Sequence, residues 1–249
     1  MLLIGQSFFI EYKLVNANIL EAEGMYRWTT RQRILMGCAS MAMAIIGDYL
    51  LGYGTIEMTS DSGAYMGIAW NIVPDWRYAV SSILGFACAA LFAVGAVTLM
   101  RVMEGKYALG ESKLYRLFKI ANWGGILYFA FIHIAICMLP VVFNAGMEAT
   151  GDIPTAANMA LRVAKSIVVP MVLGFIVCDG FVTAAWIGMI VRGMLPLKKA
   201  ALVFNPIMIA LIGQLMNCVH NGLDSGFESL GWGAMYLVCA MKLVEKQER

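Results

Sequence analysis

Six long apolar stretches, each able to cross a bilayer as a helix, constrain this chain more than any other feature. A spanning helix needs roughly 20 apolar residues. The chain is 61% hydrophobic and only 14% charged, whereas soluble domains carry about 25% charged residues. The sequence therefore predicts an all-α, polytopic integral membrane bundle of about six transmembrane helices, over residues 32–54, 78–100, 117–143, 167–194, 200–220 and 227–244.

The remaining residues leave little room for another domain. We expect residues 1–31 to form an interfacial N-terminal segment, residues 32–244 the transmembrane domain, and residues 245–249 a short cytoplasmic tail. The chain begins with apolar residues but has no basic stretch and no small-residue cleavage site there, so we do not interpret it as a signal peptide.

The basic residues indicate the orientation. With six spans, 15 of the 18 Lys and Arg residues fall on one side and 3 on the other. Cytoplasmic loops carry the excess of Lys and Arg, which places both termini in the cytoplasm of a multi-pass cell-membrane protein. A net charge of +2 without a basic patch gives no case for nucleic acid.

Cysteine and histidine usage argues against disulfide and metal chemistry. The six cysteines fall one per span rather than in loops, which favours small buried hydrophobes over a disulfide framework. Only two histidines occur, without a His-Glu-x-x-His or Cys-x-x-Cys pattern. We predict no metal and no cofactor, although a mixed set of His133, His220, Asp48 and Asp224 is a weaker alternative.

Three Asp and His residues lie well inside predicted spans, away from their ends: Asp48, His133 and Asp179. A charge at the centre of a bilayer costs roughly 2.5–3.5 kcal/mol even on the lenient insertion scale, and such residues usually face a bundle interior or water. Each also has a structural interpretation, as an interhelical hydrogen-bond partner. Near the fourth span, Asp152 and Pro154 predict a helix start, and Pro170 predicts a kink.

The fifth span carries a polar stripe. Four residues recur at i, i+3, i+4 and i+7 and so share one helix face; Gln214 extends this stripe inward and Glu228 extends it outward. The four are Asn217, His220, Asn221 and Asp224. Because most of these polar groups fall in the outer half of the membrane, we predict a polar cavity that opens outward. The second span, with a small-residue ridge at Gly85, Ala89 and Ala93, is interpreted as structural.

The segment Gly47-Asp48-Tyr49-Leu50-Leu51-Gly52-Tyr53 resembles a motif of bacterial multi-pass membrane proteins of unknown function. It is also faintly similar to the Gly-Asp-x-x-Leu element of the lysoplasmalogenase-like family, whose members cleave an ether lipid within the membrane. The resemblance covers seven residues and implies a functional Asp48. That family has more spans, and Cys178-Asp179-Gly180 departs from its second Asp-containing motif.

Our leading hypothesis is a protein that binds or chemically modifies a membrane lipid or other apolar small molecule. As an enzyme, it would be an intramembrane lipid hydrolase, isomerase or cyclase. Asp48 and Asp224 are the acid and base candidates, and His133 or His220 is the proton shuttle. The predicted substrate-binding residues are Asp179, Gln214, Asn217, Asn221 and Tyr53. A serine triad is not supported, because no Gly-x-Ser-x-Gly occurs.

Two further classes stay open at this point. A small proton-coupled transporter would use Asp48, His133 and Asp179 as a descending relay. An accessory subunit of a membrane complex, or a homo-oligomer, would use the small-residue ridges to pack against another membrane protein.

Overall fold

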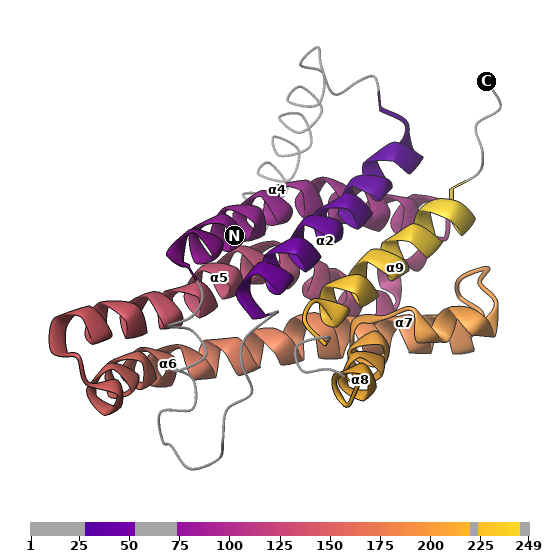
Figure 1. Ribbon diagram of the computed structural model, residues 1–249. Coiled ribbons are helices and arrows are strands. Elements are labelled where there is room, and N and C mark those ends of the chain that lie inside the picture. Colours follow the sequence, from indigo (N-terminus) through magenta and orange to yellow (C-terminus); the bar gives the residue numbers. More distant parts are fainter. Residues whose placement is uncertain (1–27, 53–73, 220–223, 245–249) are drawn as a thin grey trace, which may run out of the picture.

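The computed structural model describes residues 28–52, 74–219 and 224–244. In these ranges all regular secondary structure is helical (Figure 1). The principal helices are α2 (Thr30–Gly52), α4 (Asp75–Gly105), α5 (Lys113–Thr150), α6 (Ile153–Phe175), α7 (Phe181–Val191), α8 (Pro206–Asn217) and α9 (Phe227–Lys242). Three short segments join them: η2 (Leu109–Glu111), η3 (Ile176–Gly180) and η4 (Lys199–Val203).

Four helical segments are long and apolar enough to cross a membrane: Thr30–Leu51, Asp75–Gly105, Lys113–Thr150 and Ile153–Val191. They confirm that the first four predicted spans are long apolar helices at about the predicted positions. The last two predicted spans correspond to shorter helices, since α8 has 12 residues and α9 has 16. The count of six spans therefore stays a prediction.

Side-chain caps fix three helix starts. Asp152 accepts a hydrogen bond from the backbone N–H of Thr155 at 2.9 Å, and Asn205 accepts one from Met208 at 3.0 Å. Ser112 caps α5 in the same way. Each cap satisfies a backbone N–H that has no partner within its helix. The predicted helix start at Asp152 is confirmed.

The helices pack closely where their contact residues are small. A Cβ added to Gly95 of α4 would lie 2.6 Å from the Cα of Gly37 on α2, and a Cβ added to Gly37 would lie 2.4 Å from the Tyr236 ring of α9. Glycine thus lets the backbones approach, as is usual for helices in membranes. The buried centre holds Phe92, Phe129 and Trp232, with ring centroids 4.9 to 5.5 Å apart.

Helices α5 and α6 form a long hairpin that extends past the other helices at one end (Figure 1). With 38 residues, α5 is roughly 57 Å long at about 1.5 Å per residue, longer than the roughly 30 Å hydrocarbon core of a bilayer. The helix continues through Pro170, where we expected a kink. That kink stays a prediction; a π-helical segment, η3, follows α6 directly.

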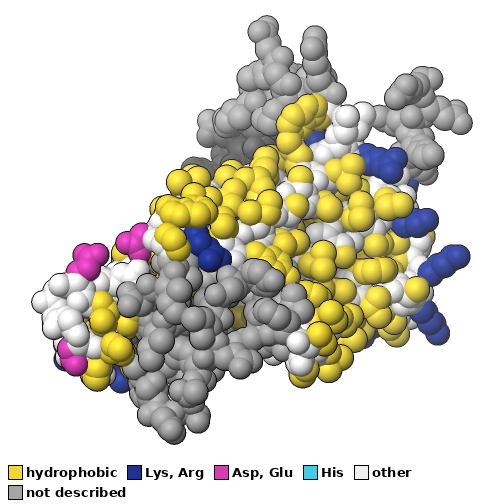
Figure 2. Space-filling model, in the orientation of Figure 1, with side chains coloured by type: hydrophobic (Ala, Val, Ile, Leu, Met, Phe, Trp, Pro, Cys, Tyr) yellow, Lys and Arg dark blue, Asp and Glu magenta, His cyan; other side chains and the backbone are white. Residues whose placement is uncertain are grey.

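Basic side chains gather at the end of the bundle opposite the hairpin (Figure 2). By the antiparallel course of the helices, this end holds the start of α2 and α5 and the end of α4, α7 and α9. Apolar side chains cover much of the surface between the two ends (Figure 2). The exposed residues of α6 include Val168, Val169, Val172 and Leu173, which are 46% to 64% exposed.

Candidate functional site

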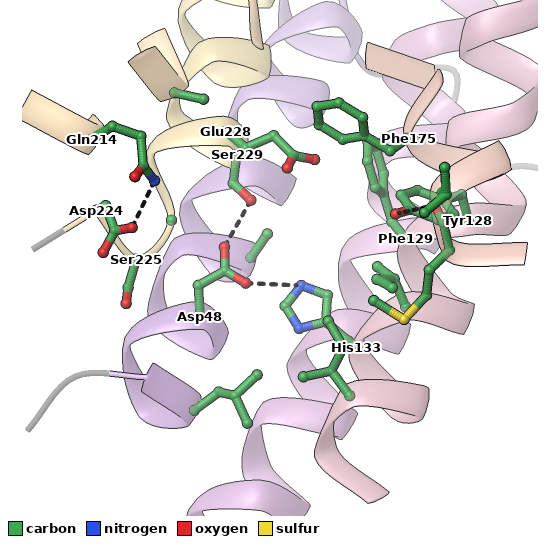
Figure 3. Close-up of a pocket in the computed structure, with 18 residues that line it drawn as sticks. Asp48, Tyr128, Phe129, His133, Phe175, Gln214, Asp224, Ser225, Glu228 and Ser229 are labelled. Atoms are coloured by element: carbon green, nitrogen blue, oxygen red, sulfur yellow. Dashed lines mark hydrogen bonds and ion pairs between the residues drawn. The ribbon is translucent and has the colours of Figure 1, made fainter. Parts of the chain in front are cut away.

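A cavity of about 540 Å³ lies between α2, α5, α6, α8 and the start of α9 (Figure 3). This volume falls within the usual range for a small-molecule site, roughly 300–1,000 Å³. One part of its wall is apolar and includes Phe129, Ile132, Ile136, Val172 and Phe175. The opposite part carries carboxyl, imidazole, hydroxyl and amide groups, so the cavity suits a molecule with both apolar and polar parts.

Asp48, Ser229 and His133 form the central polar contact of this wall. One oxygen of Asp48 accepts a hydrogen bond from the Ser229 hydroxyl at 2.8 Å, and the other lies 3.5 Å from Nε2 of His133. The Asp48 side chain is 26% exposed, whereas that of His133 is only 7% exposed. Asp48 therefore presents the reachable carboxyl group, and His133 supports it from the protein side (Figure 3).

The position of His133 is set by glycines on two neighbouring helices. A Cβ on Gly85 of α4 would lie 2.3 Å from the His133 Cβ, and a Cβ on Gly47 of α2 would lie 3.3 Å from the ring atom Cε1. The hydroxyl of Ser81 donates a hydrogen bond to the Gly47 carbonyl at 2.9 Å, which ties α4 to α2 beside Asp48. Gly85 was interpreted as part of a structural ridge; it also makes room for the histidine.

A tight turn brings the start of α9 onto α2. Gly226 has φ +80°, a left-handed conformation that favours glycine, and a Cβ there would lie 3.2 Å from the Cα of Ile45. Just before it, Asp224 accepts a hydrogen bond from the amide of Gln214 on α8 at 2.8 Å. This turn places Ser229 one helical turn further along, against Asp48.

Four of the predicted site residues line the cavity: Asp48, His133, Gln214 and Asp224. The prediction of one polar stripe along a single helix was wrong, because α8 ends at Asn217 and Asp224 lies in the turn before α9. Gln214 and Asp224 thus come together across two elements rather than along one helix. His220, Asn221 and Tyr53 lie outside the described residues; Asn217 is the last residue of α8.

Asp179 does not line the cavity; its side chain is fully buried in η3. Its Oδ1 atom accepts a hydrogen bond from the indole N–H of Trp232 at 2.6 Å. A π-helical turn contains an extra residue and so changes which residues face inward. Cys178 and Asp179 are accordingly buried, although the preceding residues Phe175 and Ile176 are exposed.

Sequence reasoning missed Ser229, Trp232 and the role of Glu228. Glu228 and Ser229 follow each other at the start of α9, and both line the cavity. The spacing of Glu228 and Trp232, four residues apart on a helix, was a usable signal that they share a face. Nothing in the sequence around Ser229 indicates a partner on α2, 181 residues away.

Within the described ranges, no group of three or more His, Cys, Asp or Glu residues is arranged to hold a metal ion. Four cysteines are buried, Cys38 is partly buried and Cys218 is exposed, and all six are free thiols. The cavity residues offer carboxyl, imidazole, hydroxyl and amide groups, which transfer protons and form hydrogen bonds.

Comparison with known proteins gives a family without an assigned activity. One protein family, described as a family of unknown function (DUF6796), matches residues 16–246. No curated protein and no solved structure matches the chain. The similarity of residues 47–53 to the lysoplasmalogenase-like element accordingly stays a prediction.

Proposed function

Because the chain belongs to the DUF6796 family, whose function is unknown, we propose its function from the cavity. We propose that it is a multi-pass membrane protein that binds a lipid or other amphipathic molecule and modifies it by acid–base chemistry at Asp48 and His133. The observation that carries this proposal is the contact of Ser229, Asp48 and His133 in the wall of a largely apolar cavity.

In this proposal, the Asp48 carboxyl is the group that meets the bound molecule. It is the more exposed member of the pair and lines the cavity. With Asp48 as the base, a proton taken from the ligand goes to the carboxylate, and the imidazole beside it shares or releases that proton. Such positioned proton transfer typically contributes 10²–10⁴-fold in rate. Asp224, held by Gln214, supplies a second carboxyl at the same cavity.

Ser229 is a positioning residue in this scheme. In a nucleophilic triad the serine hydroxyl bonds to the imidazole, and the carboxylate lies on the far side of the histidine. Here the order is different, since Asp48 lies between the hydroxyl and the imidazole. The Ser229 hydroxyl donates a hydrogen bond to the carboxylate, and no imidazole accepts its proton for nucleophilic attack.

A lipid would enter the cavity from the side. Val172 and Phe175 of α6 line the cavity and are also 52% and 41% exposed, so its wall borders the apolar surface of the bundle. The gathering of Lys and Arg at the opposite end (Figure 2) supports cytoplasmic termini by the positive-inside rule. The cavity then lies toward the outer leaflet, with α8 and α9 as the two last, short passes.

The test is mass-spectrometric lipid profiling of membranes that hold the wild-type chain or its Asp48→Asn variant. Asp152→Asn is the matched control, because it makes the same chemical change at an exposed cap where Asn serves as well as Asp. We expect a species that is made or consumed with wild type and with the control but not with Asp48→Asn. Identical profiles in all three membranes would refute the assignment.

A Ser229→Ala variant separates positioning from chemistry. Removing this hydroxyl leaves Asp48 and His133 in place but takes away one of the two contacts that hold the carboxylate. We expect the same product as with wild type, formed more slowly. A loss as complete as that of Asp48→Asn would contradict the positioning role and would favour a direct part for the hydroxyl.

A further inference from the structure

One oxygen of the buried Asp179 has no hydrogen-bond donor. The side chain is fully buried, and Oδ1 is satisfied by the indole N–H of Trp232 at 2.6 Å. Oδ2 has no hydrogen-bond partner among the described residues. Buried polar atoms are nearly always paired, so the missing donor needs an explanation.

Glu228 is the side chain placed to supply that donor. It lies four residues before Trp232 on α9, so the two share the helix face that meets η3. The Glu228 carboxyl interacts with that of Asp179. Glu228 also lines the cavity, whereas Asp179 does not. In Figure 3, Glu228 extends away from Ser229 and Asp48, toward Phe175.

Among the described residues that line the cavity, no lysine or arginine is placed to compensate two neighbouring carboxylates. The titratable groups facing the pair are Tyr128 of α5, Cys178 of η3 and, from α2, Asp48 with its partner His133. The Tyr128 hydroxyl donates its hydrogen bond to the Met171 carbonyl at 3.2 Å. Two adjacent carboxyl groups that are shielded from water and have no cation beside them cannot both be ionised, because the two negative charges repel each other.

We propose that Asp179 and Glu228 form a proton-binding site in which one proton, carried by Glu228, is donated to Oδ2 of Asp179. The proton comes from water in the cavity, which Glu228 reaches and Asp179 does not. The carboxylic acid then provides the donor that Oδ2 lacks, and the pair carries one negative charge. This site goes beyond the chemistry at Asp48 and needs no substrate to be detected.

The direct test is infrared spectroscopy of the purified full-length chain at neutral pH. A protonated, buried carboxyl group gives a C=O stretch at higher frequency than the amide band, and this stretch shifts in D₂O. We expect it in wild type, and we expect Glu228→Gln to remove it. Glu111→Gln is the matched control, because the Glu111 side chain is 98% exposed. A full band in Glu228→Gln, or no band in wild type, would overturn the proposal.

A pair of substitutions tests the donated hydrogen bond separately. The Gln amide in Glu228→Gln can donate an N–H to Oδ2, as the acid O–H does, whereas Glu228→Ala leaves Oδ2 without a donor. We expect Glu228→Gln to unfold at a temperature near that of wild type and Glu228→Ala to unfold clearly lower. Equal losses in both variants would contradict a proton on Glu228. Neither measurement depends on lipid turnover, so failure of the Asp48 chemistry would be seen apart from failure of this site.

Discussion

Substituting Ala for Gly85 should destabilise the protein and displace His133. The added Cβ would lie 2.3 Å from the His133 Cβ and 2.4 Å from its Cγ, whereas an ordinary contact is no shorter than 3.4 Å. Because a Cβ moves with its helix, no side-chain rotation relieves the contact, and α4 and α5 must separate by about 1 Å. Overpacking typically costs about 1–3 kcal/mol, and Ala regains up to about 1 kcal/mol of helix propensity. Because the contact is as short as 2.3 Å, we take the overpacking cost from the upper part of its range, so the net loss is about 1–2 kcal/mol.

The buried cysteines provide the assay. Cys88, Cys137, Cys178 and Cys239 are buried, so a thiol-reactive dye labels them only as the chain unfolds on heating. For a chain of this size a loss of 1 kcal/mol lowers Tm by about 2–4 °C, which gives a decrease of about 2–8 °C. Gly105→Ala is the control, since a Cβ there meets nothing within 4 Å. Equal Tm values for the two Ala variants would refute the packing argument.

Three further predictions use the same thermal measurement. Trp232→Phe keeps an aromatic ring but loses the N–H donated to Asp179 and leaves part of the buried indole volume empty. A hydrogen bond to a charged group contributes about 1.5–3 kcal/mol, so Tm should fall, and an unchanged Tm would contradict the stabilising role of this bond. Hydrogen bonds from Thr155 lower the pKa of Asp152, so this cap stabilises the fold at neutral pH and its contribution is lost as the pH falls through that lowered pKa. As the pH is lowered, Tm should therefore fall more steeply in wild type than in Asp152→Asn. Parallel curves of Tm against pH for the two proteins would contradict this contribution of the cap. Asn205→Ala removes the buried cap of α8 and should cost about 1–2 kcal/mol; a loss below 0.5 kcal/mol would count against it.

The long helices were predictable because length and apolar composition alone identify a spanning segment. Helix starts were predictable where a short polar side chain precedes the helix, as at Asp152. The π-helical turn that buries Asp179 was not, because residues 167–178 are apolar throughout and so have no alternation of polar and apolar residues for an extra residue to shift. Helix α9 lies within two residues of its predicted bounds. Helix α8 is much shorter than predicted, since the apolar residues begin before the helix does, in η4.

For the site, the sequence identified single residues but not their partners. Asp48 and His133 were chosen because ionisable groups inside apolar spans are rare, and the structure brings them to 3.5 Å. Their contact depends on close packing at Gly47 and Gly85, which a small-residue ridge indicates only in general terms. Ser229 reaches Asp48 through the turn at Gly226, and a contact between the two ends of a chain cannot be inferred from local spacing.

The packing below the cavity favours binding and chemistry over transport. Along α9, Glu228 and Ser229 line the cavity, and the next turn carries Trp232 toward the basic end of the bundle. Phe92 and Phe129 meet the Trp232 ring edge-on at centroid distances of 5.4 and 5.5 Å, and all three side chains are buried. A cargo leaving the cavity in this direction would have to part these rings and break the hydrogen bond between Trp232 and Asp179. A carrier exposes its site to both sides in turn, so transport would require α9 to separate from α5. An enzyme acting on a lipid would need no such movement, because substrate and product would both use the lateral entry proposed above.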